Sequence, residues 1–61
     1  MKTRAERLLK KLEDLQFDIY HFGGILEESI RNRNNVAEMI CESGFELDAA
    51  INKMKKAIEL I

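Results

Sequence analysis

Apolar residues recur in alternating steps of three and four along two stretches of the chain. In the first stretch they stand at Ala5, Leu8, Leu12, Leu15, Ile19, Phe22 and Leu26. In the second they stand at Ala37, Ile40, Leu47, Ile51, Met54, Ile58 and Ile61, with Gly44 in the same series. This repeat places its members on one stripe of an α-helix. The chain has no proline to break either stripe, so the pattern predicts two long helices.

A polar run, RNRNN at residues 31–35, separates the two stripes. Asparagine tolerates the backbone conformations of turns and helix caps. Asn35 followed three residues later by Glu38 predicts an N-cap with a reciprocal partner, a capping box, just before Val36. We therefore expect one all-α domain over residues 1–61, an antiparallel two-helix hairpin. Its helices are expected at about 4–31 and 36–60, with the turn at about 32–35.

Three glycines lie within the predicted helices. Both stripes keep their phase across Gly23, Gly24 and Gly44, which predicts that each helix is continuous. An alternative is a new helix beginning near residue 44, because the sequence from Ser43 onward also matches a capping box. Folding the chain about residue 34 sets Gly44 opposite Gly24, and Phe45 opposite Gly23. The glycines are then places where the helices pack closely, or alternatively a hinge.

Each helix also carries apolar residues outside its stripe, at Leu9, Phe17, Tyr20, Ile25, Ile30, Met39 and Phe45. A hairpin covers one stripe per helix, so this surplus predicts a homodimer that forms a four-helix bundle. Single exposed apolar residues are the alternative interpretation. A chain of 61 residues with one cysteine, Cys41, has no disulfide or Cys/His metal set to support a small core, which also favours self-association.

Composition narrows the class of protein. Charged residues make up 34% of the chain with a net charge of −1 and both signs interspersed, which is typical of a soluble surface and disfavours nucleic acid as a partner. The apolar runs are too short to cross a membrane, and the start of the chain lacks the apolar segment of a secretory signal. One free cysteine fits a reducing cytoplasm. Nothing in the sequence calls for a cofactor or a metal.

Several residues are candidates for contacts or chemistry. Glu46 and Asp48 flank Leu47, where carboxylates either meet a partner or serve as ordinary surface charge. Basic residues gather near the start of the first predicted helix and near the end of the second, which lie at the same end of the hairpin. They are Lys2, Arg4, Arg7, Lys10, Lys11, Lys53, Lys55 and Lys56. Such an end binds an acidic partner or an RNA backbone, or it simply keeps the bundle soluble. His21 forms an i, i+3 pair with Asp18, but a metal or acid–base role would need Glu42 or Glu46 to converge on it from the second helix, and we interpret it as a surface histidine. Cys41 has no histidine within reach by spacing, and we interpret it as an apolar filler.

Residues 44–54, GFELDAAINKM, resemble the signature of the small sporulation-regulatory phosphatases. That signature is S-Q-E-L-D followed by an apolar residue and often an asparagine, and it is matched at Glu46, Leu47, Asp48, Ile51 and Asn52. Leu12-Glu13-Asp14-Leu15-Gln16 and Ile19-Tyr20 are similar to the family's first helix. Gly44 or Ser43 stands at the signature serine, Phe45 replaces its glutamine, and Gln16 replaces the usual arginine of the first helix.

The resemblance implies an antiparallel helical hairpin that assists hydrolysis of the phospho-aspartate on a sporulation response regulator, without a covalent intermediate. Glu46, Asp48 and Asn52 would then lie in the surface that meets the regulator. The connection between the matched blocks is longer than the family pattern leads us to expect. The resemblance therefore predicts a small regulatory protein that binds a protein partner, and one that is less a self-contained enzyme than a binding protein.

A second resemblance is architectural. Rop, a plasmid RNA-binding protein, is also a short hairpin that dimerises into a four-helix bundle, and Ile40-Cys41-Glu42-Ser43 is similar to a stretch of its second helix. Rop's RNA-binding face is not matched residue by residue, so the likeness is one of fold. It implies an alternative function as a nucleic-acid-binding or purely structural dimer. Contact with phosphates would then fall to Lys10, Lys11, Lys53 and Lys56.

Overall fold

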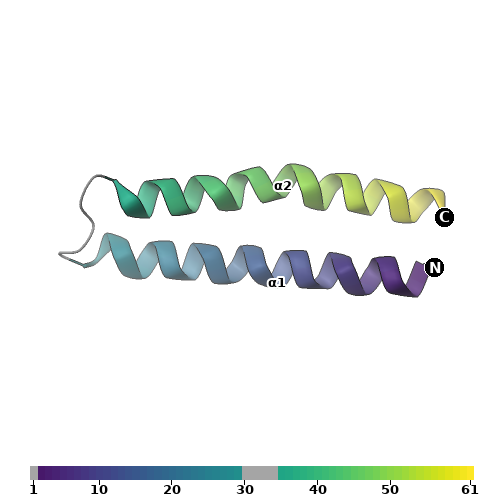
Figure 1. Cartoon of the computed structure of the whole chain (residues 1–61), viewed down its shortest axis with the longest axis horizontal. Coiled ribbons are helices and arrows are strands. Elements are labelled where there is room, and N and C mark those ends of the chain that lie inside the picture. Colours follow the sequence, from purple (N-terminus) through teal and green to yellow (C-terminus); the bar gives the residue numbers. More distant parts are fainter. Residues whose placement is uncertain (1, 30–34) are drawn as a thin grey trace.

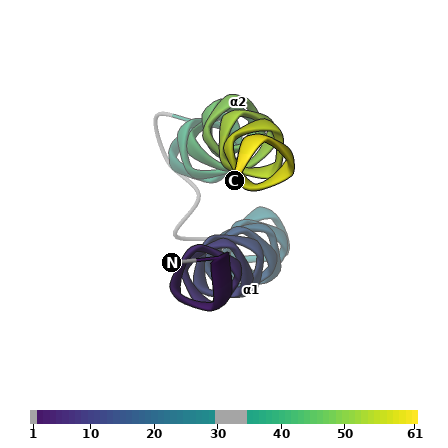
Figure 2. The ribbon, with the colours of Figure 1, turned by 90° about the vertical axis from the view of Figure 1, so that its right-hand side faces the viewer.

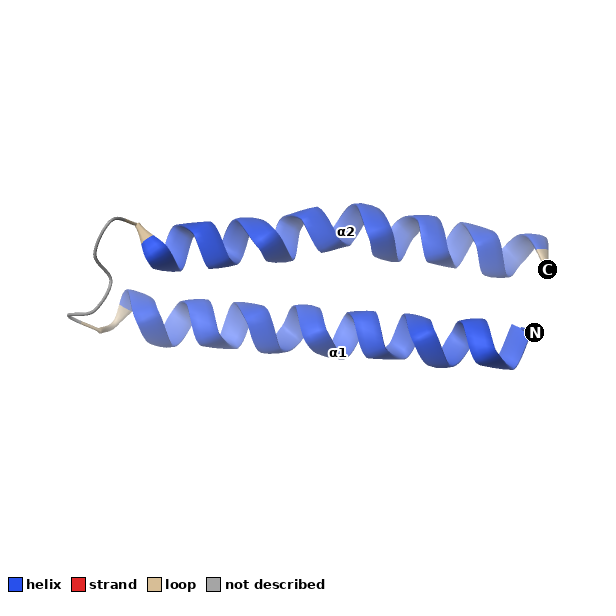
Figure 3. Ribbon diagram, viewed as in Figure 1, coloured by secondary structure: helices blue, strands red, loops and turns tan. Residues whose placement is uncertain are grey.

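The chain forms two antiparallel helices that pack side by side. The computed structural model describes residues 2–29 and 35–61, with α1 over Lys2–Glu27 and α2 over Val36–Leu60 (Figure 1). Figure 3 shows the same hairpin coloured by secondary structure, and no strand occurs in the described part. The hairpin measures 46 × 15 × 10 Å, and both chain ends lie at the end opposite the connection. The predicted all-α hairpin is confirmed.

The first helix ends earlier than the sequence pattern predicts. Its last helical residue is Glu27, whereas the prediction extended to residue 31. The backbone N–H of Ser29 donates to the carbonyl of Leu26 at 3.0 Å. This bond spans three residues, so it tightens the chain into a turn directly after the last apolar residue of the stripe. The predicted turn at residues 32–35 falls mostly outside the described residues, and only Asn35 can be compared.

Asn35 begins the second helix, but without the predicted capping box. Its backbone is left-handed, with φ 58° and ψ 37°, and its side chain makes no capping hydrogen bond. A capping side chain reaches the first turn from an extended backbone, which Asn35 does not have. Asparagine is one of the few residues that adopt the left-handed region readily. Asn35 still accepts the first helical hydrogen bond, from the N–H of Met39 at 3.0 Å.

Both helices run through their glycines, as the unbroken phase of the stripes predicts. The alternative start near residue 44 is wrong, because α2 is continuous from Val36 to Leu60. The Ser43 hydroxyl donates to the carbonyl of Ile40 at 2.6 Å. It therefore bonds back into the preceding turn instead of capping a new helix.

The helices meet in a register different from the predicted one. A Cβ atom placed on Gly23 would lie 2.6 Å from the Cys41 sulfur, and one placed on Gly44 would lie 2.5 Å from the Tyr20 ring. Gly24 has open space around the same position. The predicted pairs, Gly24 with Gly44 and Gly23 with Phe45, are therefore wrong by about one helical turn. The cause is the early end of α1, which moves the midpoint of the hairpin toward the N-terminus.

The core between the helices is thin. Among the described residues, Ala37 (0% exposed) and Ile51 (4%) are the buried hydrophobic side chains, together with Gly23 and Gly44. No large side chain in the described part is fully buried. A monomeric hairpin of this kind therefore removes little apolar surface from water.

One part of the predicted stripe of α1 does not face α2. Leu8, Leu15 and Phe22 are exposed by 45%, 50% and 52%. Their places against α2 are taken by the next residues in the chain, Leu9 and Gln16, which are half-buried, and Gly23, which is buried. The rotation follows from packing, since Gly23 lets the backbones approach and Gln16 reaches polar atoms of α2. Neither helix of the described part is long and apolar enough to span a membrane.

The glycines provide a matched test of close packing. Gly24→Ala is expected to raise the free energy of unfolding by about 1 kcal/mol, because alanine favours helix and meets no atom there. Gly44→Leu is expected to lower it by about 1–3 kcal/mol, because the new side chain must displace the Tyr20 ring. Urea melts followed by circular dichroism at one fixed protein concentration would measure both. Equal effects at the two positions would contradict close packing at Gly44.

Candidate functional site

One side of the hairpin carries a cluster of polar and aromatic side chains that joins the two helices. We call it the polar face and define it by Gln16, Tyr20, Phe45 and Asp48. Gln16 and Tyr20 are one turn apart on α1, and Phe45 and Asp48 are one turn apart on α2. Residues three or four apart share one side of a helix, so each helix contributes a neighbouring pair. Figure 2 shows the two helices from the end that carries the termini.

Gln16 holds this face together. Its amide nitrogen donates to the Asp48 carboxylate at 2.6 Å and to the Gly44 carbonyl at 2.9 Å, and it lies 3.5 Å from the Tyr20 hydroxyl. The amide group has two N–H donors, so it can serve both α2 acceptors at once. The bond to Asp48 is charge-assisted and correspondingly short. Gln16 therefore fixes the position of the Asp48 carboxylate at an otherwise exposed surface.

Tyr20 lies where the missing side chain of Gly44 leaves room. Its ring packs against Phe45, with 5.7 Å between the ring centroids and 51° between the ring planes. Partial burial, and after it the negative charge of Asp48, raise the pKa of Tyr20, while its hydrogen bond with Gln16 acts in the opposite direction. The phenol therefore stays protonated at neutral pH, and its hydroxyl remains available as a donor at this surface.

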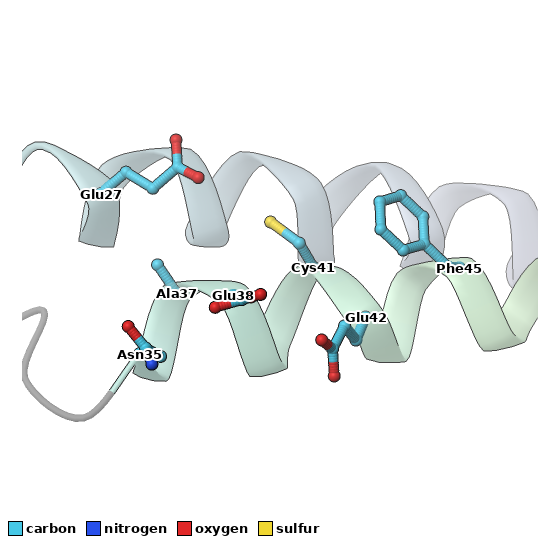
Figure 4. A pocket seen from close by; sticks show the side chains of 7 residues that line it. All are labelled: Glu27, Asn35, Ala37, Glu38, Cys41, Glu42 and Phe45. Carbon is cyan, nitrogen blue, oxygen red and sulfur yellow. The ribbon is translucent and has the colours of Figure 1, made fainter.

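An open groove continues the polar face toward the connection. It has a volume of about 420 Å³ and is lined by Glu27, Asn35, Ala37, Glu38, Cys41, Glu42 and Phe45 (Figure 4). Figure 4 shows Cys41 and Phe45 rising from α2 toward α1, while Glu27 comes from α1. Within residues 2–29 and 35–61, no group of three potential ligands converges to hold a metal ion. The groove is thus an open extension of the polar face.

The structure separates the three residues predicted to contact a partner. Asp48 belongs to the polar face, and Asn52 lies one turn further along the same side of α2, exposed. Glu46 is exposed as well, but it stands two positions before Asp48. Residues two apart on a helix point to different sides. Asp48 and Asn52 therefore share a surface that Glu46 does not reach.

The basic candidates lie near the end that carries both termini. Lys10, Lys11, Lys53 and Lys56 are all exposed, and that end of both helices is seen in Figure 1. Lys10 pairs with Asp14 at 3.0 Å, with side chains exposed by 72% and 61%. The hydrogen bond to Asp14, and then its charge, raise the pKa of Lys10. A lysine engaged in this way is a weaker candidate for phosphate contact than Lys11, Lys53 or Lys56.

His21 and Cys41 are placed apart from each other. His21 is exposed and stacks on Phe17, with 6.5 Å between the ring centroids and 4° between the planes. Cys41 is half-buried and stands against Gly23. His21 is thus a surface histidine, as the sequence pattern indicated. Cys41 fills space against Gly23, where an added Cβ atom would lie 2.6 Å from its sulfur.

Sequence reasoning missed the roles of Gln16 and Tyr20. Gln16 drew attention only as the replacement for an arginine in the family pattern. The signal that could have revealed it is the series Leu9, Gln16 and Gly23, whose members are seven residues apart and therefore lie on one line of the helix. In this series a polar and a small residue follow a leucine. A polar residue in such a line has to find a partner on the facing helix.

Coupling between Gln16 and Asp48 tests the central hydrogen bond. We expect the effects of Gln16→Ala and Asp48→Ala on the free energy of unfolding to be non-additive by about 1 kcal/mol, because each substitution alone removes the same bond. Glu46→Ala provides the control, since Glu46 lies on another side of α2 and should show no coupling to Gln16. Chemical denaturation of the single and double variants gives the coupling free energy. Additive effects of Gln16→Ala and Asp48→Ala would contradict the bond.

Titration of the single tyrosine tests the surroundings of its hydroxyl. Near-ultraviolet absorbance is expected to show Tyr20 ionising above its ordinary pKa of 10.0, and Asp48→Asn should lower that pKa by removing the negative charge. Because the folded-state pKa is the higher one, the unfolded chain loses this proton first. The stabilising contribution is complete below pH 10 and is lost as the pH rises from 10 through the folded-state pKa. A normal pKa in the folded protein would contradict the effect of partial burial and of the Asp48 charge on this hydroxyl.

Comparison with known proteins identifies no relative of this chain. No family model matches the chain, and searches of characterised proteins and of solved structures find no match. The resemblances to the sporulation phosphatases and to Rop therefore remain predictions from the sequence.

Proposed function

We propose that this chain is a small regulatory protein of the cytoplasm that acts by binding a protein partner through the polar face. The position of Asp48 carries the proposal, because its carboxylate lies at the surface and is held by Gln16 from the opposite helix. Enclosed, mostly apolar pockets are the usual sites for small molecules, and the groove beside Phe45 is open and lined by Glu27, Glu38 and Glu42. A macromolecular surface is the better match for such a face.

Within this class, we propose hydrolysis of a phospho-aspartate on a response regulator as the activity. The sequence resemblance at Asp48 and Asn52 supports it, and the geometry adds a chemical reason. Water must be oriented in line with the phosphorus atom, and a carboxylate or an amide can do so. The water oxygen then bonds to phosphorus while the bond to the partner's aspartate oxygen breaks. The products are inorganic phosphate and the free carboxylate, so no covalent intermediate on this chain is needed.

The proposal changes the part assigned to Glu46. Asp48 and Asn52 present a carboxylate and an amide on one side of α2, beside the amide of Gln16. Glu46 points away from this set. We therefore assign the contact with the regulator to Asp48 and Asn52, assisted by Gln16 in place of the family's arginine.

A homodimer is part of the proposal, because the described hairpin buries only Ala37 and Ile51 as hydrophobic core. Two hairpins in a four-helix bundle would cover much more apolar surface. The second candidate function, a Rop-like dimer that binds nucleic acid, draws on the exposed lysines Lys11, Lys53 and Lys56. It is less favoured because the net charge is −1 and Lys10 is already paired.

Incubation with phosphorylated receiver domains from the same organism tests the activity. The wild-type chain is expected to shorten the phosphoryl half-life of one receiver at least several-fold, and Asp48→Ala should abolish the effect. Glu46→Ala is the matched control and should retain it, since Glu46 lies outside the polar face. Unchanged half-lives for every receiver would rule out the phosphatase.

An RNA-binding measurement over a range of salt concentrations separates the second candidate. Binding through several phosphates weakens steeply as salt increases, and loss of a contacting lysine reduces that slope. We expect no such binding from the wild-type chain. Tight RNA binding that Lys53→Gln weakens would instead favour the Rop-like function.

A further inference from the structure

The hairpin has a second, apolar face formed by residues at seven-residue spacing. On α1 it contains Leu8, Leu15 and Phe22, which are about half exposed. On α2 the corresponding line is Ile40, Leu47 and Met54, which are half-buried. We call these six residues the apolar face. Val36, Ala50 and Ala57 lie on the neighbouring line of side chains along α2 and make the apolar face wider.

Both lines lie on the same side of the hairpin, opposite the polar face. Leu15 directly precedes Gln16 on α1, and Leu47 directly precedes Asp48 on α2. Stepping back one residue turns a side chain by about 100° round its helix. Because the helices are antiparallel, the two turns have opposite senses when viewed from one end. They carry Leu15 and Leu47 to the same side, away from the Gln16–Asp48 bond.

The size of the exposed surface fits one partner of similar size. The chain exposes 5158 Å², whereas a compact folded monomer of 7.1 kDa is expected to expose roughly 4,100 Å². The excess is about 1,000 Å², and a standard stable interface buries about 800 Å² on each partner. A second copy of the hairpin, laid along the apolar face, would cover an area of this size.

Charged residues that border the apolar face indicate the direction of that second copy. Lys11 and Asp18 border it on α1, and Glu46 and Lys53 border it on α2, all four exposed. The contacts of Gln16 with Asp48 and of Tyr20 with Gly44 fix which residues of the two helices are level. By the same register, Lys11 is level with Lys53, and Asp18 is level with Glu46.

Two arrangements bring the apolar faces together, and the charges distinguish them. If both connections lie at the same end, α1 of one copy packs on α2 of the other. Lys11 then meets Lys53 of the partner subunit, and Asp18 meets Glu46 of the partner subunit, which places like charges together. Charges bordering an apolar seam are known to set partner orientation, and these oppose this arrangement.

If the connections lie at opposite ends, α1 packs on α1 and α2 packs on α2. In this arrangement a two-fold axis placed midway between Lys11 and Asp18 on α1 also lies midway between Glu46 and Lys53 on α2. Both midpoints fall at the same level of the hairpin. Lys11 meets Asp18 of the partner subunit, and Glu46 meets Lys53 of the partner subunit, so symmetry gives four pairs of opposite charge. We propose that the apolar face is closed by a second copy of this chain in this antiparallel arrangement.

This inference specifies the homodimer of the proposed function and is independent of the phosphatase activity. It leaves both polar faces on the outside of the bundle, each open to a partner. If the chain forms this dimer but shortens no phosphoryl half-life, the antiparallel dimer is supported and the phosphatase activity is ruled out. If the chain is an active phosphatase but stays monomeric, the activity is supported and the dimer is ruled out.

Sedimentation and charge reversal test the arrangement together. The wild-type chain is expected to sediment as a dimer at micromolar concentration. Lys11→Glu and Asp18→Lys should each weaken the dimer several-fold, and the combined variant should restore it, because the opposite charges are exchanged. In the arrangement with both connections at the same end, Lys11→Glu would strengthen the dimer by facing Lys53 of the partner subunit. That result, or a folded wild-type monomer, would overturn the proposal.

Cross-linking tests the position of the two-fold axis in a way that does not depend on affinity. Ala50 lies at the level of the axis, so Ala50→Cys in a Cys41→Ser background should form a disulfide between copies under mild oxidation. Ala57→Cys is the matched control, because its symmetry mate would lie about 20 Å away along the bundle. Cross-linking at position 57 as readily as at position 50, or at neither, would overturn the antiparallel arrangement. Circular dichroism of the reduced variants verifies that each is folded.

Discussion

The close approach of the helices at Gly23 and Gly44 is the constraint on which the rest of this structure depends. At both positions a single added carbon atom would meet a side chain of the other helix at 2.6 Å or less. Each glycine costs about 1 kcal/mol of helix propensity relative to alanine, and the close approach offsets that cost. It also determines which side of α1 faces α2, because Gly23 has to lie between the helices.

The polar face follows from this rotation of α1. With Gly23 turned inward, Gln16 one heptad earlier also points toward α2, where the backbone carbonyl of the buried Gly44 and the Asp48 carboxylate accept its hydrogen bonds. Tyr20 occupies the space left at Gly44. The same rotation turns Leu8, Leu15 and Phe22 out of the contact and exposes them. One packing requirement therefore generates both a polar surface and an apolar one, on opposite sides of the hairpin.

The sequence pattern predicts the elements of this fold better than their contacts. Periodicity identified two helices and their continuity through the glycines, because each apolar stripe keeps its phase over many turns. It could not set the register, because apolar residues continue at helical spacing from Leu26 to Ile30 and do not reveal that α1 ends at Glu27. It also assigned Leu15, and not Gln16, to the contact with α2. A period of seven residues cannot distinguish the line that contains Leu15 from the adjacent line that contains Gln16. The hydrogen bonds of Gln16 to α2 and the close packing at Gly23 place the second line in the contact.

Charge is distributed unevenly along the length of the hairpin. Eight of the ten lysines and arginines fall within residues 2–11 and 53–56, at the end where the termini meet, while Glu27, Glu38 and Glu42 surround the groove near the connection. A rod 46 Å long with this separation of charge has an electric dipole moment along its axis even though its net charge is only −1. Such a moment orients a molecule in the field of an approaching partner before contact. In the proposed antiparallel pair the two moments would cancel. The dipole moment would then orient two single hairpins as they approach each other, whereas the finished pair would have no net moment along the bundle.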